Sequence, residues 1–357
     1  MATTGPARLG WIEACRGLAA TAVVIYHVVR HFDKNGGLPR LDSVVQFGHA
    51  GVDLFFVISG FIILFVHFDD IGEPFRIRRY VERRLTRILP AYWVAVALTA
   101  GMALAGGHTT SLHDLAWAIL PVPISSEPIV DVAWTLQYEF VFYVLFAVLI
   151  LRRAVGVGLM LGWLAVIIAG AVSTTVLPIP GAFYGLFALE FFAGMAVAYR
   201  LRRGTLPGYK TVLMAGIVFF AGCAAAEDLG WMNGYGSFAR IVYGLASALV
   251  ILGAAEASRR GVARVPSVLQ ILGSASYSIY LFQFVFIGLA WKSWLAAGLE
   301  ARVPPVIGCA VFCLATLAGG VVMSRLVEHP LMRVIRDVMQ GRDVRKAAGV
   351  VPNVPAA

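Results

Sequence analysis

The chain has 357 residues, of which 59% are hydrophobic and only 14% are charged, and its mean hydropathy is +0.80. One water-soluble globule cannot bury that much apolar surface, so the composition excludes an ordinary soluble protein and predicts a chain covered largely by lipid. The net charge of +9 does not indicate a nucleic acid partner, because membrane proteins gather Lys and Arg on their cytoplasmic loops.

Long apolar segments predict ten membrane-spanning helices, each able to cross about 30 Å of hydrocarbon. They are expected at residues 10–30, 47–67, 88–106, 133–151, 155–177, 183–199, 211–227, 238–257, 268–290 and 304–325. The fold class is therefore all-α, a polytopic transmembrane helical bundle. The membrane domain is expected over residues 1–340 and a flexible cytoplasmic tail over residues 341–357. With the N-terminus inside, most Lys and Arg residues fall on inner connections, so both termini are expected in the cytoplasm.

Two ionisable side chains share one face of the first span. Arg16 and His27 are eleven residues apart, which is about 20° beyond three full turns and about 16 Å along the helix axis. Arg16 is expected near the inner membrane surface, and His27 about one turn from the outer end. Because an ionisable group in hydrocarbon costs about 2.5 kcal/mol or more, each is expected to have a partner or a task.

The connection between the second and third spans is rich in arginine, with six Arg and no Lys from Arg76 to Arg87. Arg84 and Arg87 are three residues apart and share a helix face, and Arg79 and Arg83 form a neighbouring pair. Positive-inside topology alone would account for their charge. It does not require guanidinium groups, however, and paired guanidiniums suit phosphate binding. These arginines therefore favour an anion site at the inner end of the third span.

Three further spans carry a polar residue at a similar depth in the outer half of the membrane. These residues are Asp53 in the second span, Glu139 in the fourth and Gln283 in the ninth. Together with His27 they form either a polar knot that joins helices or a general base whose charge and tautomer a carboxylate holds. Glu139 is the expected partner of His27, and Asp53 is the less favoured one.

The inner arginines and the polar residues of the outer half together predict the shape of a substrate. The inner arginines could hold the phosphates of a nucleotide-type donor, while a slender arm of some 15–20 Å reaches along the first helix to His27. Coenzyme A has this shape. No metal is expected, because the sequence has no ligand cluster of recognisable spacing.

The same residues resemble the acyltransferase-3 family of membrane O-acyltransferases, especially its members that modify exopolysaccharides and lipopolysaccharides. The resemblance covers nearly the whole chain and rests on six motifs in order. They are Arg16-GLAATAVVIY-His27, Gly51-VDLFFVISGF, Arg84-LTRILP, Trp134-TLQYEFVFY, Ser276-YSIYL and Glu328-HP. One position departs from the family, since many members have His where Gln283 stands. Glutamine can only position groups by hydrogen bonding.

The resemblance implies a membrane enzyme that moves an acyl group, most often acetyl, from cytoplasmic acyl-CoA to a carbohydrate or glycolipid hydroxyl at the outer side of a bacterial inner membrane. It implies acyl-CoA as co-substrate, with no bound cofactor. The expected catalytic residues are His27, as general base or acyl relay, with Glu139 and Asp53. The expected donor-binding residues are Arg16, Arg84, Arg87 and Arg83, and the expected lining residues are Trp134, Tyr280, Gln283 and Ser59.

A transporter of a lipid-linked glycan or of a proton-coupled solute is the alternative function. Buried His and carboxylate side chains also suit proton relays. Against a transporter, the sequence shows no inverted repeat and no paired spans broken by Gly or Pro. Cleavage of an acyl-CoA thioester would distinguish the enzyme from the transporter.

Overall fold

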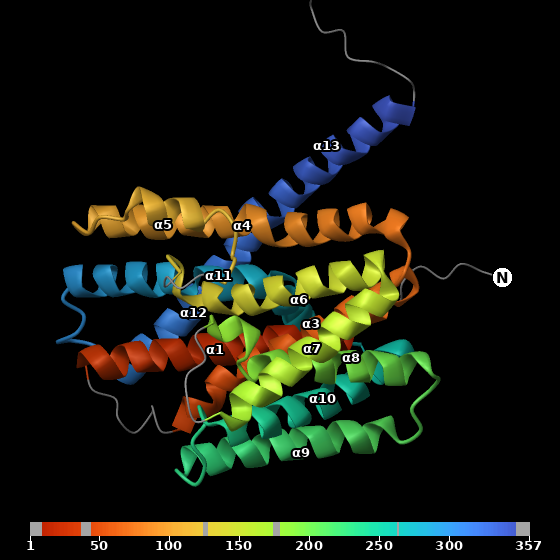
Figure 1. The fold of residues 1–357 in the computed structure, drawn as a ribbon. Coiled ribbons are helices and arrows are strands. Elements are labelled where there is room, and N and C mark those ends of the chain that lie inside the picture. Colours follow the sequence, from red (N-terminus) through yellow and green to blue (C-terminus); the bar gives the residue numbers. More distant parts are fainter. Residues whose placement is uncertain (1–8, 37–43, 124–127, 174–178, 263, 348–357) are drawn as a thin grey trace, which may run out of the picture.

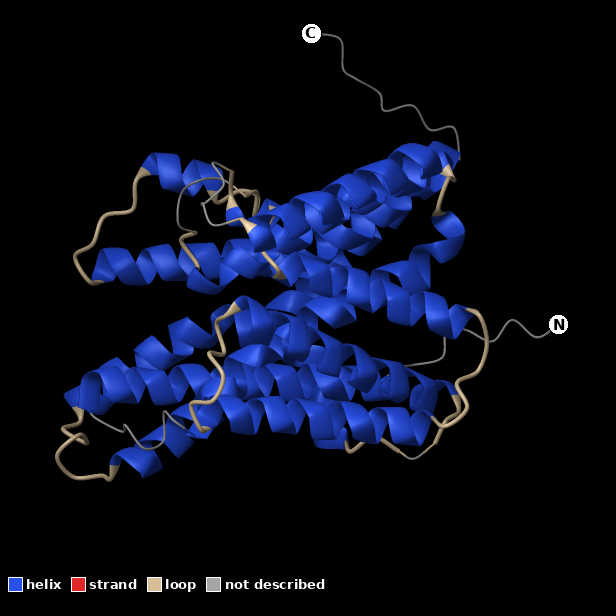
Figure 2. Cartoon of the chain, turned by 60° about the horizontal axis from the view of Figure 1, so that its bottom comes forward, coloured by secondary structure: helices blue, strands red, loops and turns tan. Residues whose placement is uncertain are grey.

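The computed structural model describes residues 9–36, 44–123, 128–173, 179–262 and 264–347. These residues form helices and loops without a strand (Figure 2), and ten helical segments are long and apolar enough to cross a membrane. The predicted all-α bundle of ten spans is thus confirmed, and its orientation stays a prediction. The crossing helices are α1 (Gly10–Gly36), α3 (Gly51–His67), α4 (Ile77–Ala105), α6 (Trp134–Leu151), α7 (Arg153–Val172), α8 (Phe187–Arg202), α9 (Tyr209–Asp228), α10 (Ser237–Arg259), α11 (Ser267–Ala296) and α12 (Pro305–Met323).

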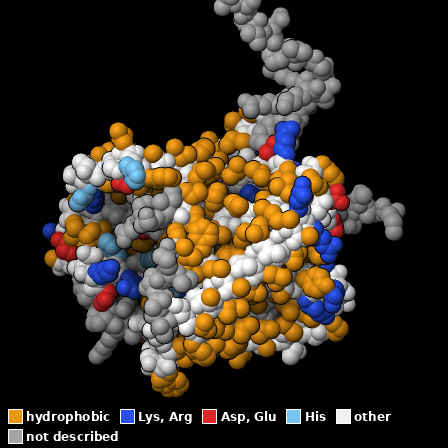
Figure 3. All heavy atoms as spheres, in the orientation of Figure 1, with side chains coloured by type: hydrophobic (Ala, Val, Ile, Leu, Met, Phe, Trp, Pro, Cys, Tyr) orange, Lys and Arg blue, Asp and Glu red, His pale blue; other side chains and the backbone are white. Residues whose placement is uncertain are grey.

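The crossing helices lie side by side, and α13 (His329–Ala347) leaves the bundle at an angle after a π-helical turn, Ser324–Glu328 (Figure 1). The closest pairs are α1 with α11, α3 with α8, α9 with α10, and α11 with α12. In the most apolar window, 61% of the residues are buried in α1, α3, α10 and α11, against 22% in α7 and α9. The centre of the bundle is therefore formed by α1, α3, α10 and α11. Apolar side chains cover much of the outside (Figure 3), as lipid contact requires.

Small residues let α3 and α8 approach closely. A side chain at Gly60 would overlap the backbone of Phe191, and one at Gly194 would overlap the backbone of Val57. Such glycine contacts are common where membrane helices pack by van der Waals contact rather than by the hydrophobic effect. This packing fixes the rotation of α3, and with it the directions in which Asp53 and Ser59 project.

The two ends of the bundle differ in charge. Lys and Arg side chains gather where α1 begins and where α3 is followed by α4, at the right of Figure 3. We call this the basic end, and the opposite end, where α1 finishes and α3 begins, the far end. The predicted orientation places the basic end in the cytoplasm.

Two helices extend further than hydropathy predicted. We expected the third span at residues 88–106, but α4 already begins at Ile77, so the arginine-rich segment and the apolar segment belong to one helix. A charged helix that continues past the membrane surface has no hydropathy signal of its own, which explains the difference. At the other end of the chain α13 continues to Ala347, within the expected tail of residues 341–357. Residues 348–357 lie outside the described part of the chain.

Candidate active site

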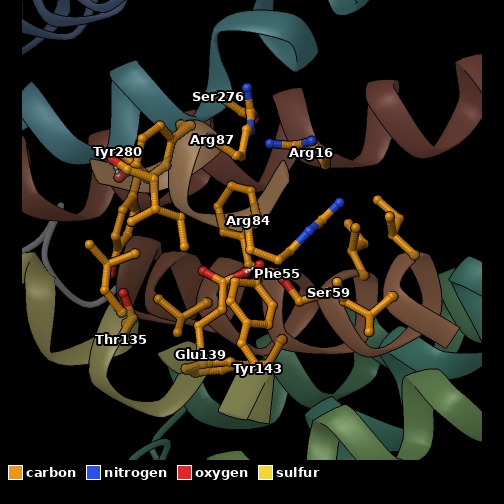
Figure 4. A pocket seen from close by; sticks show the side chains of 18 residues that line it. Arg16, Phe55, Ser59, Arg84, Arg87, Thr135, Glu139, Tyr143, Ser276 and Tyr280 are labelled. Carbon is orange, nitrogen blue, oxygen red and sulfur yellow. Dashed lines mark hydrogen bonds between the residues drawn. The ribbon is translucent and has the colours of Figure 1, made fainter. Parts of the chain in front are cut away.

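A pocket of about 140 Å³ lies between α1, α3, α4, α6 and α11 (Figure 4). Five different helices supply its walls, so its polar groups come together only in the folded bundle. The polar side chains that line it are Arg16, Ser59, Arg84, Arg87, Thr135, Glu139, Tyr143, Ser276, Tyr277 and Tyr280. Six of these were expected from the sequence as site residues: Arg16, Ser59, Arg84, Arg87, Glu139 and Tyr280.

A second, wider space of about 940 Å³ opens at the basic end, and we call it the vestibule. The vestibule and the pocket share four lining residues, Arg16, Ile62, Arg84 and Arg87. The two spaces are therefore neighbours, with three guanidinium groups where they meet. Arg83, which we expected at the donor site, lines the vestibule.

The three shared arginines differ in their protein partners. Arg87 forms an ion pair of 2.5 Å with Glu328, whose other carboxylate oxygen accepts a 2.6 Å hydrogen bond from Ser278. In the described part of the chain no hydrogen bond or ion pair is found for Arg16 or Arg84, and Arg84 lies over the ring of Tyr143. A buried guanidinium without a partner is costly unless a ligand supplies the acceptors. Arg16 and Arg84 are therefore free to bind an anion.

Glu139 is held on the wall of the pocket by two neighbours. Its carboxylate accepts a 2.8 Å hydrogen bond from the Ser59 hydroxyl and a second one from the Tyr143 hydroxyl, one turn further along α6. These contacts join α3 to α6 and aim the carboxylate into the pocket (Figure 4). The sequence predicted that Glu139 would be functional, but it did not reveal these two hydrogen bonds.

His27 lies beyond the pocket, toward the far end. Its ring contacts Tyr26 at 4.9 Å and Phe284 at 4.7 Å between centroids. Phe284 is four residues after Tyr280 on α11, so His27 lies about one helical turn past a residue that lines the pocket. Between the two levels, the rings of Phe55 and Tyr280 meet at 5.9 Å. An arm that fills the pocket would have to pass this aromatic pair to reach His27.

The structure does not join His27 to either expected carboxylate. Among the described residues, no hydrogen bond or ion pair links His27 to Glu139 or Asp53, because both carboxylates are turned toward other groups. Glu139 bonds to Ser59 and Tyr143, and Asp53, which is fully buried, forms an ion pair of 2.5 Å with Arg240 of α10. Gln283 is also buried, donates to the carbonyl of Tyr280 and does not line the pocket. Trp134 packs against Phe56 and Phe187 instead.

A second polar network, not predicted from the sequence, surrounds Asp53. The Arg240 guanidinium bonds to Asp53 and to His49 of the short helix η1 (Gln46–Ala50), and His49 forms a 2.8 Å contact with Glu227 of α9. Tyr243 donates to the same Glu227 carboxylate at 2.7 Å. Arg240 is not among the site residues that the sequence predicted. Its place inside the predicted eighth span, residues 238–257, was the signal for a buried partner.

The pairing of Asp53 with Arg240 allows the structural role and the catalytic role of Asp53 to be tested separately. Asp53→Leu should lower the thermal unfolding temperature, because removing one member of a buried pair leaves the Arg240 charge unpaired, at a cost of about 3–5 kcal/mol. Asp53→Leu combined with Arg240→Met should recover much of that loss and much of the activity. Thermal unfolding and turnover in detergent would be measured together. A double variant that is stable but inactive would show that the Asp53 carboxylate takes part in the chemistry.

Two further observations concern metal binding and the connection between α4 and α6. Among the described residues no group of three or more His, Cys, Asp or Glu side chains is placed to hold a metal ion. In the connection after α4, the short helix α5 (Leu112–Trp117) is capped by Ser111, and Ile119 accepts a hydrogen bond from the Trp93 indole. These contacts anchor the connection to α4.

Comparisons with known proteins identify the family of the chain. A family of acyltransferase domains matches residues 9–325. The exopolysaccharide production protein ExoZ of Rhizobium meliloti is 31% identical over 314 residues, which cover 85% of this chain and 93% of that protein. A Staphylococcus aureus protein named "Putative O-acetyltransferase" is 29% identical over 39% of this chain and 24% of its own length. The "Putative membrane-bound transacylase BcsY" of Komagataeibacter xylinus is 29% identical over 39% of this chain and 36% of its own length. No solved structure matches the chain.

Proposed function

This chain belongs to the acyltransferase-3 family and is a membrane O-acyltransferase, and on that premise we propose its donor, its acceptor and the direction of transfer. The donor is acyl-CoA, which enters from the cytoplasm at the basic end. The acceptor is a hydroxyl of a carbohydrate or glycolipid at the far end, on the other side of a bacterial cytoplasmic membrane. The group that moves is acetyl.

One observation carries the donor assignment: among the described residues, no hydrogen bond or ion pair is found for Arg16 or Arg84, which lie where the vestibule meets the pocket. Guanidinium groups in such a place form charge-assisted hydrogen bonds with phosphate. The narrow pocket, about 140 Å³ with mostly apolar walls, suits a slender thioester arm rather than a bulky sugar. A donor with phosphates at one end and a thin arm at the other therefore fits with its phosphates where the vestibule meets the pocket and its arm inside the pocket.

The chemistry we propose uses His27 at the end of that path. His27 takes the proton of the acceptor hydroxyl, and the hydroxyl oxygen attacks the carbonyl carbon of the thioester. The carbon–sulfur bond breaks, and the CoA thiolate takes the proton from the imidazolium. The Phe55 and Tyr280 side chains must rotate apart to admit the thioester. In a second route His27 itself carries the acyl group between donor and acceptor, and this route alone leaves an acylated protein when the acceptor is absent.

The nature of the acceptor and of the acyl group rests on the relatives. The name of the R. meliloti relative refers to exopolysaccharide production, and the name of the S. aureus relative refers to O-acetyl transfer. A polar hydroxyl acceptor would approach from the far end, because His27 lies in the second half of α1 and contacts Phe284 in the second half of α11.

Two measurements test this proposal. The purified full-length protein in nanodiscs should release more than one CoA per protein molecule from acetyl-CoA only when a surface-glycan fraction is added, and the glycan should gain one ester-linked acetyl group for each CoA released in this turnover. Cells without the gene should lose the same mass increment from their surface or secreted glycans. Absence of thioester cleavage with every glycan fraction, together with unchanged glycan masses, would contradict the proposal. Solute movement across liposomes without acetyl-CoA would instead favour a transporter.

A further inference from the structure

The rim of the vestibule carries more positive charge than the junction with the pocket requires. Beyond the shared arginines, four further guanidinium groups line it. The acidic residue in the lining, Glu82, is paired with Arg78 at 2.6 Å. Arg83 lines the vestibule together with Arg79, its neighbour Arg84 and Arg336, so these charges face a common space. The four additional arginines are Arg78, Arg79, Arg83 and Arg336.

One of these charges comes from the last helix rather than from α4. The π-helical turn Ser324–Glu328 precedes α13, which packs against α4 and leaves the bundle at an angle (Figure 1). Met332 and Arg336 are four residues apart, share a face of α13 and line the vestibule. Arg333, on the same helix, is also exposed but does not line it. Arg336 lies outside the sequence motifs that identified the donor site.

An exposed aromatic ring lies on the same rim. Phe75, in the short helix Pro74–Arg76 before α4, is 75% exposed and lines the vestibule. The Arg76 guanidinium lies 5.4 Å from the centre of this ring. An exposed ring among several guanidinium groups is the combination that binds nucleotides, because the ring stacks on a base while the arginines hold phosphates.

We propose that the vestibule rim binds the 3′-phosphoadenosine end of coenzyme A, with Phe75 stacked on the adenine and Arg336 of α13 bonded to the 3′-phosphate. The inference rests on the proposed function, in which the donor is acyl-CoA. In this arrangement Arg16 and Arg84 hold the pyrophosphate near the pocket. Arg336 then distinguishes coenzyme A from carriers that end in phosphopantetheine alone. The last helix is thus part of donor selection.

The test uses calorimetry to compare the affinities of coenzyme A and 3′-dephospho-coenzyme A for the full-length protein in nanodiscs of neutral lipid. The wild-type protein should bind coenzyme A about tenfold more tightly or better, as expected for a charge-assisted contact with phosphate. Arg336→Ala should reduce this ratio to about one while leaving the affinity for 3′-dephospho-coenzyme A within about twofold. Arg333→Ala, the matched control, should keep the wild-type ratio. Phe75→Ala should weaken both ligands about tenfold, without changing their ratio.

Each other result has a definite meaning. Equal affinities of the wild-type protein for the two ligands, or an unchanged ratio in Arg336→Ala, would overturn the inference but leave the proposed donor intact. A loss of discrimination in Arg333→Ala equal to that in Arg336→Ala would also overturn it, since general attraction to a basic surface would then explain the preference. If neither ligand binds the wild-type protein, the proposed donor itself fails.

Discussion

His27→Ala is expected to lower acyl transfer by about 10²- to 10⁴-fold, the contribution of a positioned general base. Donor affinity should stay within about twofold of the wild-type value, because His27 lies one turn beyond the pocket and does not line it. A lost turnover with retained donor binding would separate the chemical step from substrate capture. The measurements are transfer of labelled acetyl groups and calorimetric binding of coenzyme A.

His31 provides the matched control for this experiment. It is four residues further along α1, and its ring contacts Trp291 at 4.9 Å, much as His27 contacts Phe284. His31→Ala removes the same chemical group from the same helix face, so its activity should stay within a few-fold of wild type. Comparable losses in the two variants would indicate that aromatic packing at the far end, and not proton transfer at His27, limits the reaction.

Hydropathy predicted the ten spans, and helix periodicity predicted that Arg84 and Arg87 share a helix face, whereas the grouping of Arg16 with these two arginines was implied by the family resemblance. The spans and the shared face depend on the local sequence alone: an apolar segment must be helical in lipid, and residues three or four apart share a face. The resemblance to the acyltransferase-3 family rested on the same short motifs, and the family match confirms it.

Partners that are distant in the sequence could not be predicted in the same way. Asp53 pairs with Arg240, and Arg87 pairs with Glu328, across 187 and 241 residues of chain. Periodicity tells which face a charge occupies, but it does not tell which helix lies against that face. We therefore expected Glu139, with Asp53 as the less favoured choice, beside His27, because all three were expected at one depth. The contact between the Phe55 and Tyr280 rings depends on side-chain rotamers and had no signal in the sequence.

Arg16→Ala and Arg84→Ala are each expected to weaken acyl-CoA binding by about 10- to 100-fold, while the thermal unfolding temperature stays close to the wild-type value. Both effects follow from the missing protein partners: in the described chain these guanidinium groups bond to no carboxylate, so removing them breaks no ion pair. Arg87→Ala should differ, because it leaves the buried Glu328 carboxylate without its cation and should lower stability as well.

The Arg84→Lys variant tests whether donor binding requires the guanidinium group or only its charge. Lysine keeps the charge but cannot form two parallel hydrogen bonds with phosphate, so it should recover only part of the lost affinity. Arg200→Ala serves as the control, since Arg200 lies in the last turn of α8 and does not line the vestibule. Full recovery of affinity by lysine would show that positive charge alone, and not guanidinium geometry, binds the donor. An Arg16→Ala protein that binds acyl-CoA normally would remove the first helix from donor binding, and with it the proposed path along α1 toward His27.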